Sequence, residues 1–541
     1  MTSAHEAGRT VREAAFEVLR ERGLTTVFAN PGSTEVTFLG ALPEDFRFVL
    51  ALHEGALVGM ASGYAIGSGQ PAFVLVHTTA GLGNAVSALA TARVNRAPLV
   101  VLVGQQDRRH LAQEPFLAGR LGGLAGEYPV WVDQPVRAQD VPGALARAWH
   151  EARTARGPAI VVVPMDDWLA PAGEAHEIAA PARMLHARAA EPSAIAELAD
   201  LIGQASSPVL VVGAGADDPD SWAGLVELAE RLACPVWQEA FGARAGFPQD
   251  HPRFAGHLPA GRHRLREALA GHDLVLAVGA PVFRQYPYEP GPLVEPGTRV
   301  AIVTDDPAEA HRSPVDLAVL AAPAALCSEL TRVLPEPAGR APKPMERPAA
   351  PAPPAAGEPL RAAHVLAALG ERLPPDTVLV EEAPSTRPEL LARLPARRPL
   401  GFLAAAMGGL GFGLSAPIGV RMAQPGRPVV AVIGDGSAMY AIQALWSAAR
   451  YEVGAIFVVI ANGGYAVMDR LAEAQNEPVA WPGFGAIDIT AMARAQGCPA
   501  RRVETFAELE AALDEALDGI GERSEPLLLE VVVAPDKEFL V

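Results

Sequence analysis

Short apolar runs alternate with longer helix-like stretches along most of this chain. In the first third, apolar runs predict buried strands at 27–28, 48–52, 72–76, 99–103 and 159–163, with helix-like segments between them, as at 56–65 and 83–91. Strands that are apolar along their whole length are typical of parallel sheets, because helices cover both of their faces. The alternation of such strands with helices therefore predicts a doubly wound α/β domain.

The same pattern returns twice farther along the chain. After a looser stretch at 171–192, strands are predicted at 208–212, 273–278 and 299–303, and after a Pro- and Ala-rich stretch at 378–380, 428–433, 455–460 and 527–533. Pro/Ala-rich composition favours an extended, semi-rigid tether. The predicted fold class is α/β, with three doubly wound parallel-sheet domains, of which the first and third could be distant duplicates. We place a first domain at 1–180, a central domain at 190–335, a linker at 336–358 and a third domain at 359–541.

Composition and charge narrow the classes of partner. The chain has 541 residues and a formal net charge of −18. An acidic surface repels nucleic acid and anionic lipid, so we expect neither nucleic acid nor a membrane as a partner. The three cysteines, Cys234, Cys327 and Cys498, are widely spaced, which argues against a disulfide framework or a zinc site. Residues 1–24 carry charges throughout, unlike a signal peptide, and no apolar run reaches the roughly 20 residues that span a bilayer. We therefore expect a cytoplasmic protein.

The most informative segment follows the predicted strand at 428–433. It reads Gly434-Asp435-Gly436-Ser437, and a helix-like stretch at 438–450 and another strand lead from there to Asn462-Gly463-Gly464. Glycines at a strand-to-helix turn let the backbone approach a diphosphate, and the helix start offers free amides. Asp435 and Asn462 follow two strands that we expect to be neighbours, and both supply the hard oxygen ligands that suit Mg²⁺ or Ca²⁺.

A Gly-Asp-Gly alone indicates no more than a tight turn. Here, however, Asn462 lies 27 positions after Asp435, with a helix and a strand predicted between them. This arrangement resembles the thiamine-diphosphate motif. The resemblance implies that Asp435, Asn462 and the carbonyl of Gly464 hold the metal. The family usually has two consecutive asparagines, and Ala461 stands at the first of these positions.

The resemblance to thiamine-diphosphate-dependent enzymes extends over most of the chain and is closest to benzoylformate decarboxylase. It is carried by 30–33 (NPGS), 52–55 (LHEG), 77–84 (HTTAGLGN), 104–106 (GQQ), 279–284 (GAPVFR) and 408–412 (GGLGF). It implies a pyrimidine-binding, a central and a diphosphate-binding domain, thiamine diphosphate with Mg²⁺ (or Ca²⁺) as cofactors, and a small-molecule 2-oxo acid as substrate. It also implies a homodimer or homotetramer with active sites at the subunit interface.

The resemblance assigns roles to individual residues. Glu54 would hydrogen-bond the pyrimidine ring of the cofactor and activate it, although a Glu at this place could instead be an exposed helix-start carboxylate. His77 would transfer protons and Ser33 would bind the substrate carboxylate, where the plainer alternatives are a structural histidine and a turn residue. The remaining residues that it implies for cofactor binding are Gly408, Leu410, Gly434, Asp435, Gly436, Ser437, Asn462 and Tyr465.

The chain departs from the family pattern at Tyr286, where a second active-site histidine is expected. A phenol has an unperturbed pKa of about 10 and an imidazole one of about 6.5, so Tyr286 is the poorer proton shuttle at neutral pH, and it could instead only pack its domain. The positions that correspond to the substrate pocket are apolar, which favours an aromatic or branched substrate. They are Phe116, Leu117, Ala404, Val467, Met468 and Leu471.

The resemblance implies a lyase that decarboxylates a 2-oxo acid to an aldehyde, and the apolar positions favour an aromatic or branched one. One alternative is a carboligase, or a 2-hydroxyacyl-CoA lyase, that uses the same cofactor chemistry. A second alternative is a non-catalytic paralogue that binds the cofactor. In the central domain, residues 213–216 (GAGA) resemble a nucleotide-binding turn, but a tight turn between strand and helix explains them equally well, and we predict no nucleotide there.

Overall fold

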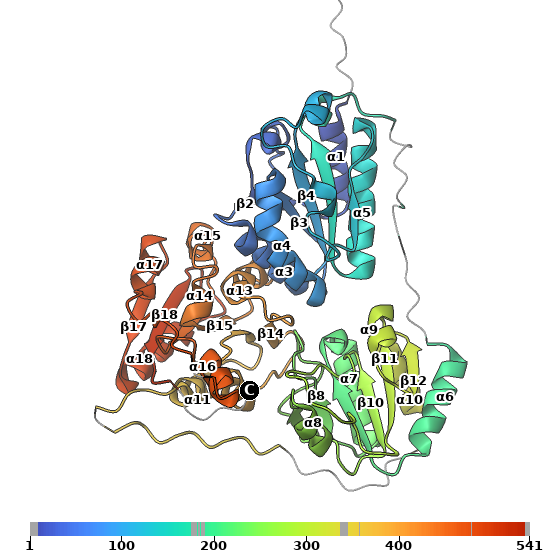
Figure 1. Cartoon of the computed structure of the whole chain (residues 1–541), viewed down its shortest axis with the longest axis vertical. Coiled ribbons are helices and arrows are strands. Elements are labelled where there is room, and N and C mark those ends of the chain that lie inside the picture. Colours follow the sequence, from blue (N-terminus) through green and yellow to red (C-terminus); the bar gives the residue numbers. More distant parts are fainter. Residues whose placement is uncertain are drawn as a thin grey trace, which may run out of the picture.

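The computed structural model describes residues 9–174, 181, 184, 190–335, 345–355, 357–477 and 479–535. Figure 1 shows three α/β units, each built around one sheet with helices on both faces. Each sheet has six strands, and every strand pair within them is parallel. The predicted fold class is therefore confirmed.

The first sheet has the strand order β2-β1-β3-β4-β6-β5. Alternate residues of β3 enter two different cores: Val74 and Val76 pack on one face of the sheet, and Phe73 and Leu75 on the other. This explains why the strands are apolar along their whole length. The strands are β1 (Thr26–Asn30), β2 (Arg47–Leu50), β3 (Ala72–Val76), β4 (Leu99–Gln105), β5 (Trp131–Asp133) and β6 (Pro158–Pro164), and the helices are α1 (Val11–Glu21), α2 (Val36–Leu39), α3 (Glu54–Ser68), α4 (Thr78–Val94) and α5 (Val141–Ala155).

The central sheet has the order β12-β11-β10-β7-β8-β9, in which the strand order reverses between β10 and β7, as in dinucleotide-binding folds. Its strands are β7 (Pro208–Val212), β8 (Val236–Gln238), β9 (Phe254–His257), β10 (Leu274–Val278), β11 (Arg299–Thr304) and β12 (Leu317–Leu320), and its helices are α6 (Pro192–Gly203), α7 (Pro219–Arg231), α8 (Arg262–Ala268), α9 (Pro307–Arg312) and α10 (Pro323–Val333).

The third sheet, β14-β13-β15-β16-β18-β17, repeats the strand order of the first with every number raised by twelve. The topology thus supports the idea that the two domains are duplicates. Its strands are β13 (Val378–Glu382), β14 (Phe402–Ala404), β15 (Val429–Gly434), β16 (Ile456–Ala461), β17 (Ala500–Val503) and β18 (Leu527–Val532). Its helices are α11 (Ala362–Arg372), α12 (Arg387–Arg393), α13 (Phe412–Ala423), α14 (Asp435–Ala438), α15 (Ala444–Arg450), α16 (Ala466–Ala474), α17 (Ile489–Ala495) and α18 (Phe506–Leu517).

The prediction of one continuous helix at 438–450 was wrong. The structure has two short helices instead, α14 and α15. Between them the backbone makes tight turns: the amide of Tyr440 donates to the carbonyl of Ser437, and that of Ala444 to the carbonyl of Ala441. Residues 345–355 of the predicted linker contain neither helix nor strand, and residues 336–344 and 356 lie outside the described residues. The domain boundaries remain predictions.

The first and third domains pack closely through α3 and α13, which lie side by side in Figure 1. One apolar core runs through both domains and includes Met60 and Ile418. The helices approach so closely that a Cβ added to Gly419 would lie 1.8 Å from the carbonyl oxygen of Met60. Only a residue without a side chain permits this contact.

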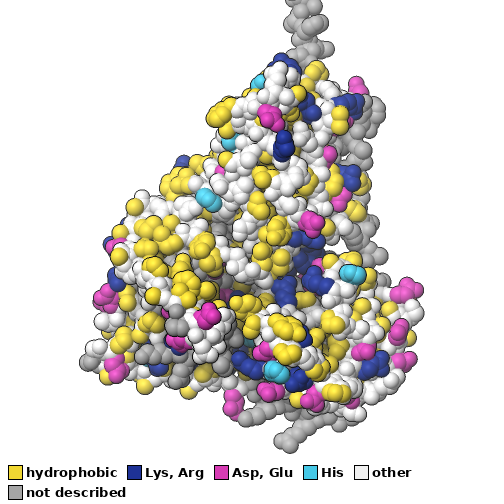
Figure 2. Space-filling view, in the orientation of Figure 1, with side chains coloured by type: hydrophobic (Ala, Val, Ile, Leu, Met, Phe, Trp, Pro, Cys, Tyr) yellow, Lys and Arg dark blue, Asp and Glu magenta, His cyan; other side chains and the backbone are white. Residues whose placement is uncertain are grey.

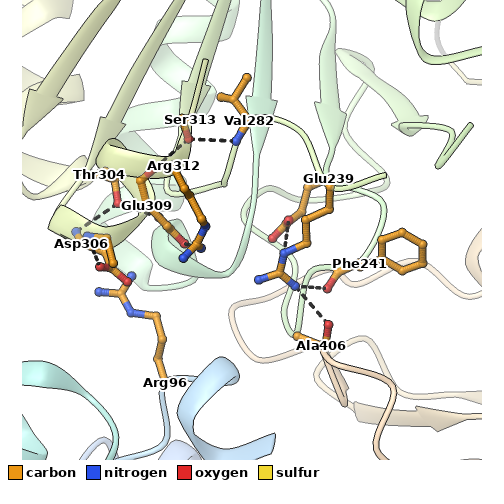
Figure 3. A network of polar contacts seen from close by, with 12 residues as sticks. Arg96, Glu239, Phe241, Val282, Thr304, Asp306, Glu309, Arg312, Ser313 and Ala406 are labelled. Atoms are coloured by element: carbon orange, nitrogen blue, oxygen red, sulfur yellow. Dashed lines mark hydrogen bonds and ion pairs between the residues drawn. The ribbon is translucent and has the colours of Figure 1, made fainter. Parts of the chain in front are cut away.

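Arginines join the central domain to the other two. Arg96 and Arg156 of the first domain both bind the carboxylate of Asp305, which follows β11, and Figure 2 shows basic side chains gathered at this junction. Arg284 of the central domain donates to the carbonyls of Phe241 and Ala406, and so reaches the third domain (Figure 3). The bond from Arg284 to Ala406 holds the loop before α13 against the central domain.

Two predictions from composition can be set against the structure. Cys234, Cys327 and Cys498 are all buried and form no disulfide with one another. Among the described residues, no helix is long and apolar enough to cross a membrane.

Candidate active site

Asp435 and Asn462 lie at the edge of the third sheet that the carboxyl ends of its strands form. The strands that precede them, β15 and β16, pair directly, as expected. One carboxylate oxygen of Asp435 accepts from the amide of Gly463 (2.6 Å) and the other from that of Gly436 (2.8 Å), while the Asn462 amide oxygen accepts from Gly464 (3.1 Å). Burial raises the pKa of the Asp435 carboxyl, and the backbone amides oppose this shift. The edge therefore carries two polar side chains that a parallel sheet brings together.

A cavity of about 330 Å³ opens beside this edge. It gathers most of the residues that the sequence predicted for the third domain, namely Leu410, Gly434, Asp435, Gly436, Ser437, Asn462, Gly464, Tyr465, Val467 and Met468. Seven further residues line it that sequence reasoning missed: Ala383, Pro384, Ser385, Thr386, Tyr440, Ile460 and Trp481. The segment at 383–386 follows a buried strand, a position that favours binding residues, whereas Trp481 carried no signal of this kind.

The residues around this cavity fit a diphosphate and a divalent cation. The donor set is a carboxylate, an amide oxygen and a backbone carbonyl, all hard oxygens. Among the described residues, no group of three or more His, Cys, Asp or Glu side chains surrounds a point, so a cation here would complete its shell from backbone, water or ligand oxygens. A Cβ on Gly436 would lie 2.7 Å from the ring of Tyr465, so the ring packs against bare backbone.

Glu382 holds the loop that carries Leu410. It lies at the end of β13 and is 5% exposed, and its two carboxylate oxygens accept from the amides of Gly411 (2.7 Å) and Gly413 (2.6 Å). Burial raises its pKa to about 8, while the backbone donors lower it. Sequence reasoning missed Glu382, although a carboxylate at the end of an apolar strand is itself a signal of a satisfied or functional role.

Glu54 begins α3 in the first domain and is 7% exposed. Its carboxylate accepts from the side-chain amides of Asn30 and Asn84, each at 3.0 Å. Both asparagines belong to segments that carried the family resemblance. Glu54 is thus a held, buried carboxylate and not the exposed helix-start residue of the alternative interpretation.

His77 follows β3 and stands next to two residues that follow Ser33. Its Nδ1 lies 3.0 Å from both Glu35 Oε2 and Thr34 Oγ1, and its side chain is 15% exposed. Ser33 is exposed at the start of a short 3₁₀ helix, Ser33–Glu35. The first domain therefore places the residues on both sides of Ser33 against His77, and the buried Glu35 among them is a residue that sequence reasoning missed.

The remaining candidates do not line the cavity of the third domain. Phe116 is 87% and Tyr286 50% exposed, and Leu117 and Leu471 also lie outside the cavity lining. Ala404 lies in β14 with no exposed surface and packs in the apolar core, and its carbonyl accepts from Asn95. No described residue of the first domain lines this cavity, so its candidates and those of the third domain form two separate groups within one chain.

The glycine turn of the central domain is explained by its own packing. A Cβ on Gly215 would lie 2.9 Å from the backbone of Gly279, and the Gly215 amide donates to the carbonyl of Gly279 (2.8 Å). The turn at 213–216 therefore fits closely against the turn after β10.

The chain matches three family descriptions in order along its length. They are the "thiamine pyrophosphate enzyme, N-terminal TPP binding domain" at residues 9–119, the "central domain" at 195–330 and the "C-terminal TPP binding domain" at 388–531. Among curated proteins, the chain is 42% identical to a benzoylformate decarboxylase of Pseudomonas aeruginosa over 527 residues, 97% of this chain and 98% of that protein.

Two solved structures are similar over 98% of this chain and 100% of their own. The 4-hydroxybenzoylformate decarboxylase of Rhodococcus jostii RHA1 is 38% identical with a TM-score of 0.92. The benzoylformate decarboxylase of Polynucleobacter necessarius is 34% identical with a TM-score of 0.93.

Three doubly wound domains, with a cavity that Asp435 and Asn462 line at the strand ends of the third and a buried carboxylate in the first, define a multidomain cofactor-binding enzyme. The chain belongs to the thiamine pyrophosphate enzyme family. The predicted resemblance to thiamine-diphosphate-dependent enzymes, and among them to benzoylformate decarboxylase, is confirmed.

Proposed function

We propose that this protein is a thiamine-diphosphate-dependent lyase that decarboxylates an aromatic 2-oxo acid to an aldehyde and CO₂. The identity of 42% over nearly the whole length to a benzoylformate decarboxylase carries the proposal. The two solved relatives act on benzoylformate and 4-hydroxybenzoylformate by name. The cavity supports an aromatic substrate, since Leu410, Val467, Met468 and Trp481 give it apolar walls.

The residues of the third domain would hold the cofactor. Thiamine diphosphate, when bound, supplies the electron sink for the bond that breaks as CO₂ leaves. The side chains of Asp435 and Asn462 and the carbonyl of Gly464 would hold Mg²⁺ and, through it, the diphosphate. Leu410 would support the cofactor from the loop that Glu382 anchors. We propose Mg²⁺ in preference to Ca²⁺ because few protein ligands are offered.

The residues of the first domain would act on the reacting groups. Glu54 would hydrogen-bond the pyrimidine ring, and its two asparagine donors fix both carboxylate oxygens for that contact. Ser33 would bind the substrate carboxylate from its exposed position. His77 would deliver a proton to the product carbon and take one from the medium. General acid–base steps of this kind contribute about 10²–10⁴-fold to a rate.

We further propose that two copies of the chain, in a homodimer or homotetramer, complete each active site. Both groups of candidates are bordered by exposed apolar side chains: Val36 (63%) and Leu52 (48%) near Ser33 and Glu54, and Tyr440 (55%), Met468 (38%) and Trp481 (39%) at the cavity. Figure 2 shows hydrophobic side chains gathered over the first and third domains. Such patches are typical of surfaces that a partner covers. The unpaired cysteines favour a cytoplasmic location.

One observation favours a second activity, the ligation of the same reaction intermediate to an added aldehyde. Tyr286 stands where the family has a second histidine, and it is half-exposed in the central domain. A tyrosine gives up its proton less readily than an imidazolium near neutral pH, so protonation of the product would be slower and capture by a second carbonyl would compete better.

The test is CO₂ release from a panel of aromatic and aliphatic 2-oxo acids, with thiamine diphosphate and Mg²⁺, with and without added benzaldehyde. We expect CO₂ and free aldehyde from benzoylformate, and loss of turnover by at least about 10²-fold in Glu54→Gln. The matched control is Glu309→Gln, another buried glutamate, which accepts from Thr304 in the central domain. Full activity of Glu54→Gln would refute the role of Glu54, and failure of every acid would refute the lyase.

A further inference from the structure

A compact hydrogen-bonded network lies behind His77. Glu35 is 1% exposed, and its Oε2 lies 3.0 Å from His77 Nδ1 and accepts from the amide of Gly32 at 2.7 Å. The hydroxyl of Thr34 donates to the other oxygen, Glu35 Oε1. Each oxygen of the carboxylate thus has a hydrogen-bond donor, and a buried carboxylate is tolerated only when its oxygens are hydrogen-bonded in this way.

Two glycines leave space for the Glu35 carboxylate and its partner next to the sheet. A Cβ on Gly104, at the end of β4, would lie 1.7 Å from Glu35 Oε1 and 2.5 Å from Thr34 Oγ1. A Cβ on Gly32 would lie 2.4 Å from the ring of His77. Two glycines from different segments therefore make space for the pair, so the Glu35–His77 contact is built by the sheet and is not a chance surface pairing.

From these contacts we infer that Glu35 is the positioning residue of His77: it fixes the imidazole with its proton on Nδ1 and leaves Nε2 as the atom that exchanges protons with the bound reactants. The inference rests on the proposed function. The alternative tautomer would set the Nδ1 lone pair against a carboxylate oxygen, which is repulsive. In catalytic triads a carboxylate on the far nitrogen of a histidine plays the same part.

The proton balance of the step is simple. Nε2 of the imidazolium gives its proton to the product carbon and takes one back from water, while the proton on Nδ1 stays between His77 and Glu35 throughout. The contact between Nδ1 and Glu35 Oε2 holds the ring in place between these events. Because Tyr286 replaces the second histidine, this one imidazole carries the proton traffic that the family divides between two.

Glu35 also connects His77 to the residue expected to bind the substrate. Its bond to the amide of Gly32 holds the turn from which Ser33 projects. The Glu35 carboxylate thereby positions both the proton-transfer group, His77, and the turn expected to bind the substrate. This explains why a charged side chain is kept at a position that is almost fully buried.

The kinetic test is a double-mutant cycle with Glu35→Gln and His77→Ala in the holoenzyme, with benzoylformate as substrate. Gln keeps the shape and can still accept from Gly32, but it lacks the charge. We expect Glu35→Gln to lower kcat about 100-fold with KM and the cofactor dissociation constant changed less than about twofold. In the His77→Ala background the same substitution should change kcat little, because the residue it acts through is gone.

Glu309→Gln is the matched control, since it alters a buried glutamate that accepts from a threonine hydroxyl without touching a histidine. Equal losses from Glu35→Gln in both backgrounds would show a merely structural role and overturn the inference. So would unchanged kcat in the single variant.

A second measurement does not depend on turnover. Solid-state NMR of protein labelled with ¹⁵N-histidine, with the His77 signals assigned by their loss in His77→Ala, reports the tautomer directly. We expect His77 to carry its proton on Nδ1 in the wild type and a mixture of tautomers in Glu35→Gln. A wild-type imidazole with its proton on Nε2 alone would refute the inference, whereas absent CO₂ release with the expected tautomer would refute only the proposed function.

Discussion

Replacement of Glu382 by alanine tests how the third domain holds its cofactor loop. The carboxylate binds the amides of Gly411 and Gly413, so its loss leaves two amides at the start of α13 without a partner. An unsatisfied buried donor costs about 1–3 kcal/mol, and water will solvate the less buried of the two. We therefore expect Glu382→Ala to lose about 1–3 kcal/mol of local stability.

The assay is hydrogen exchange followed by mass spectrometry on peptides that contain residues 408–414, together with the dissociation constant of thiamine diphosphate. A loss of about 1–3 kcal/mol should accelerate exchange of the Gly411 and Gly413 amides by about 5- to 140-fold, since about 1.4 kcal/mol is tenfold. Cofactor affinity should fall as well, because Leu410 precedes these amides directly. Unchanged exchange at both amides in Glu382→Ala would show that the Glu382 carboxylate does not hold them.

The same residue predicts a pH dependence. Its pKa is raised by burial to about 8, above its value in an unfolded chain, so the folded state holds the proton more tightly. The stabilising contribution is complete below about pH 4.3 and is lost as pH rises towards 8. The difference in stability between wild type and Glu382→Gln should therefore shift against the wild type between pH 6 and pH 8. A constant difference across this range would contradict the raised pKa.

Three further predictions concern the domain contacts and the metal. Gly419→Ala would place a Cβ 1.8 Å from the Met60 carbonyl oxygen, so it should cost about 1–3 kcal/mol and lower the thermal unfolding temperature. The control Gly426→Ala, whose Cβ would have no atom within 4 Å, should not lower it. Equal effects of the two substitutions would refute the close helix contact. Asp217→Ala should cost about 3–5 kcal/mol by leaving Arg244 buried without its carboxylate (3.3 Å), and an unchanged unfolding temperature would refute that pairing. Asp435→Ala should bind thiamine diphosphate no better with Mg²⁺ than with a chelator, and retention of the Mg²⁺ effect would refute Asp435 as a ligand.

Much of the fold followed from the sequence because parallel strands buried on both faces are apolar throughout. The runs at 72–76 and 208–212 coincide with β3 and β7, and the pairing of β15 with β16 was expected from the order of the motifs. The break between α14 and α15 was not visible, since the residues from 438 to 450 favour a continuous helix, whereas the backbone between the two helices makes tight turns.

The candidate site was predictable where a motif carries its chemistry in consecutive residues. Asp435, Asn462 and Leu410 line one cavity, and their roles there stay predictions. Glu382 and Glu35 were missed because their partners are backbone amides and a histidine that are remote in sequence. Ala404 was placed in the pocket by resemblance alone, and its burial in β14 leaves it no surface there.

The stoichiometry of benzoylformate turnover decides whether the protein is a thiamine-diphosphate-dependent decarboxylase. The purified protein is depleted of cofactor, and CO₂ and benzaldehyde are then measured with and without thiamine diphosphate and Mg²⁺. We expect one CO₂ and one benzaldehyde for each benzoylformate consumed, and none of either without the cofactor. Benzoylformate left intact by the reconstituted protein, or consumed equally well without thiamine diphosphate, would contradict this expectation.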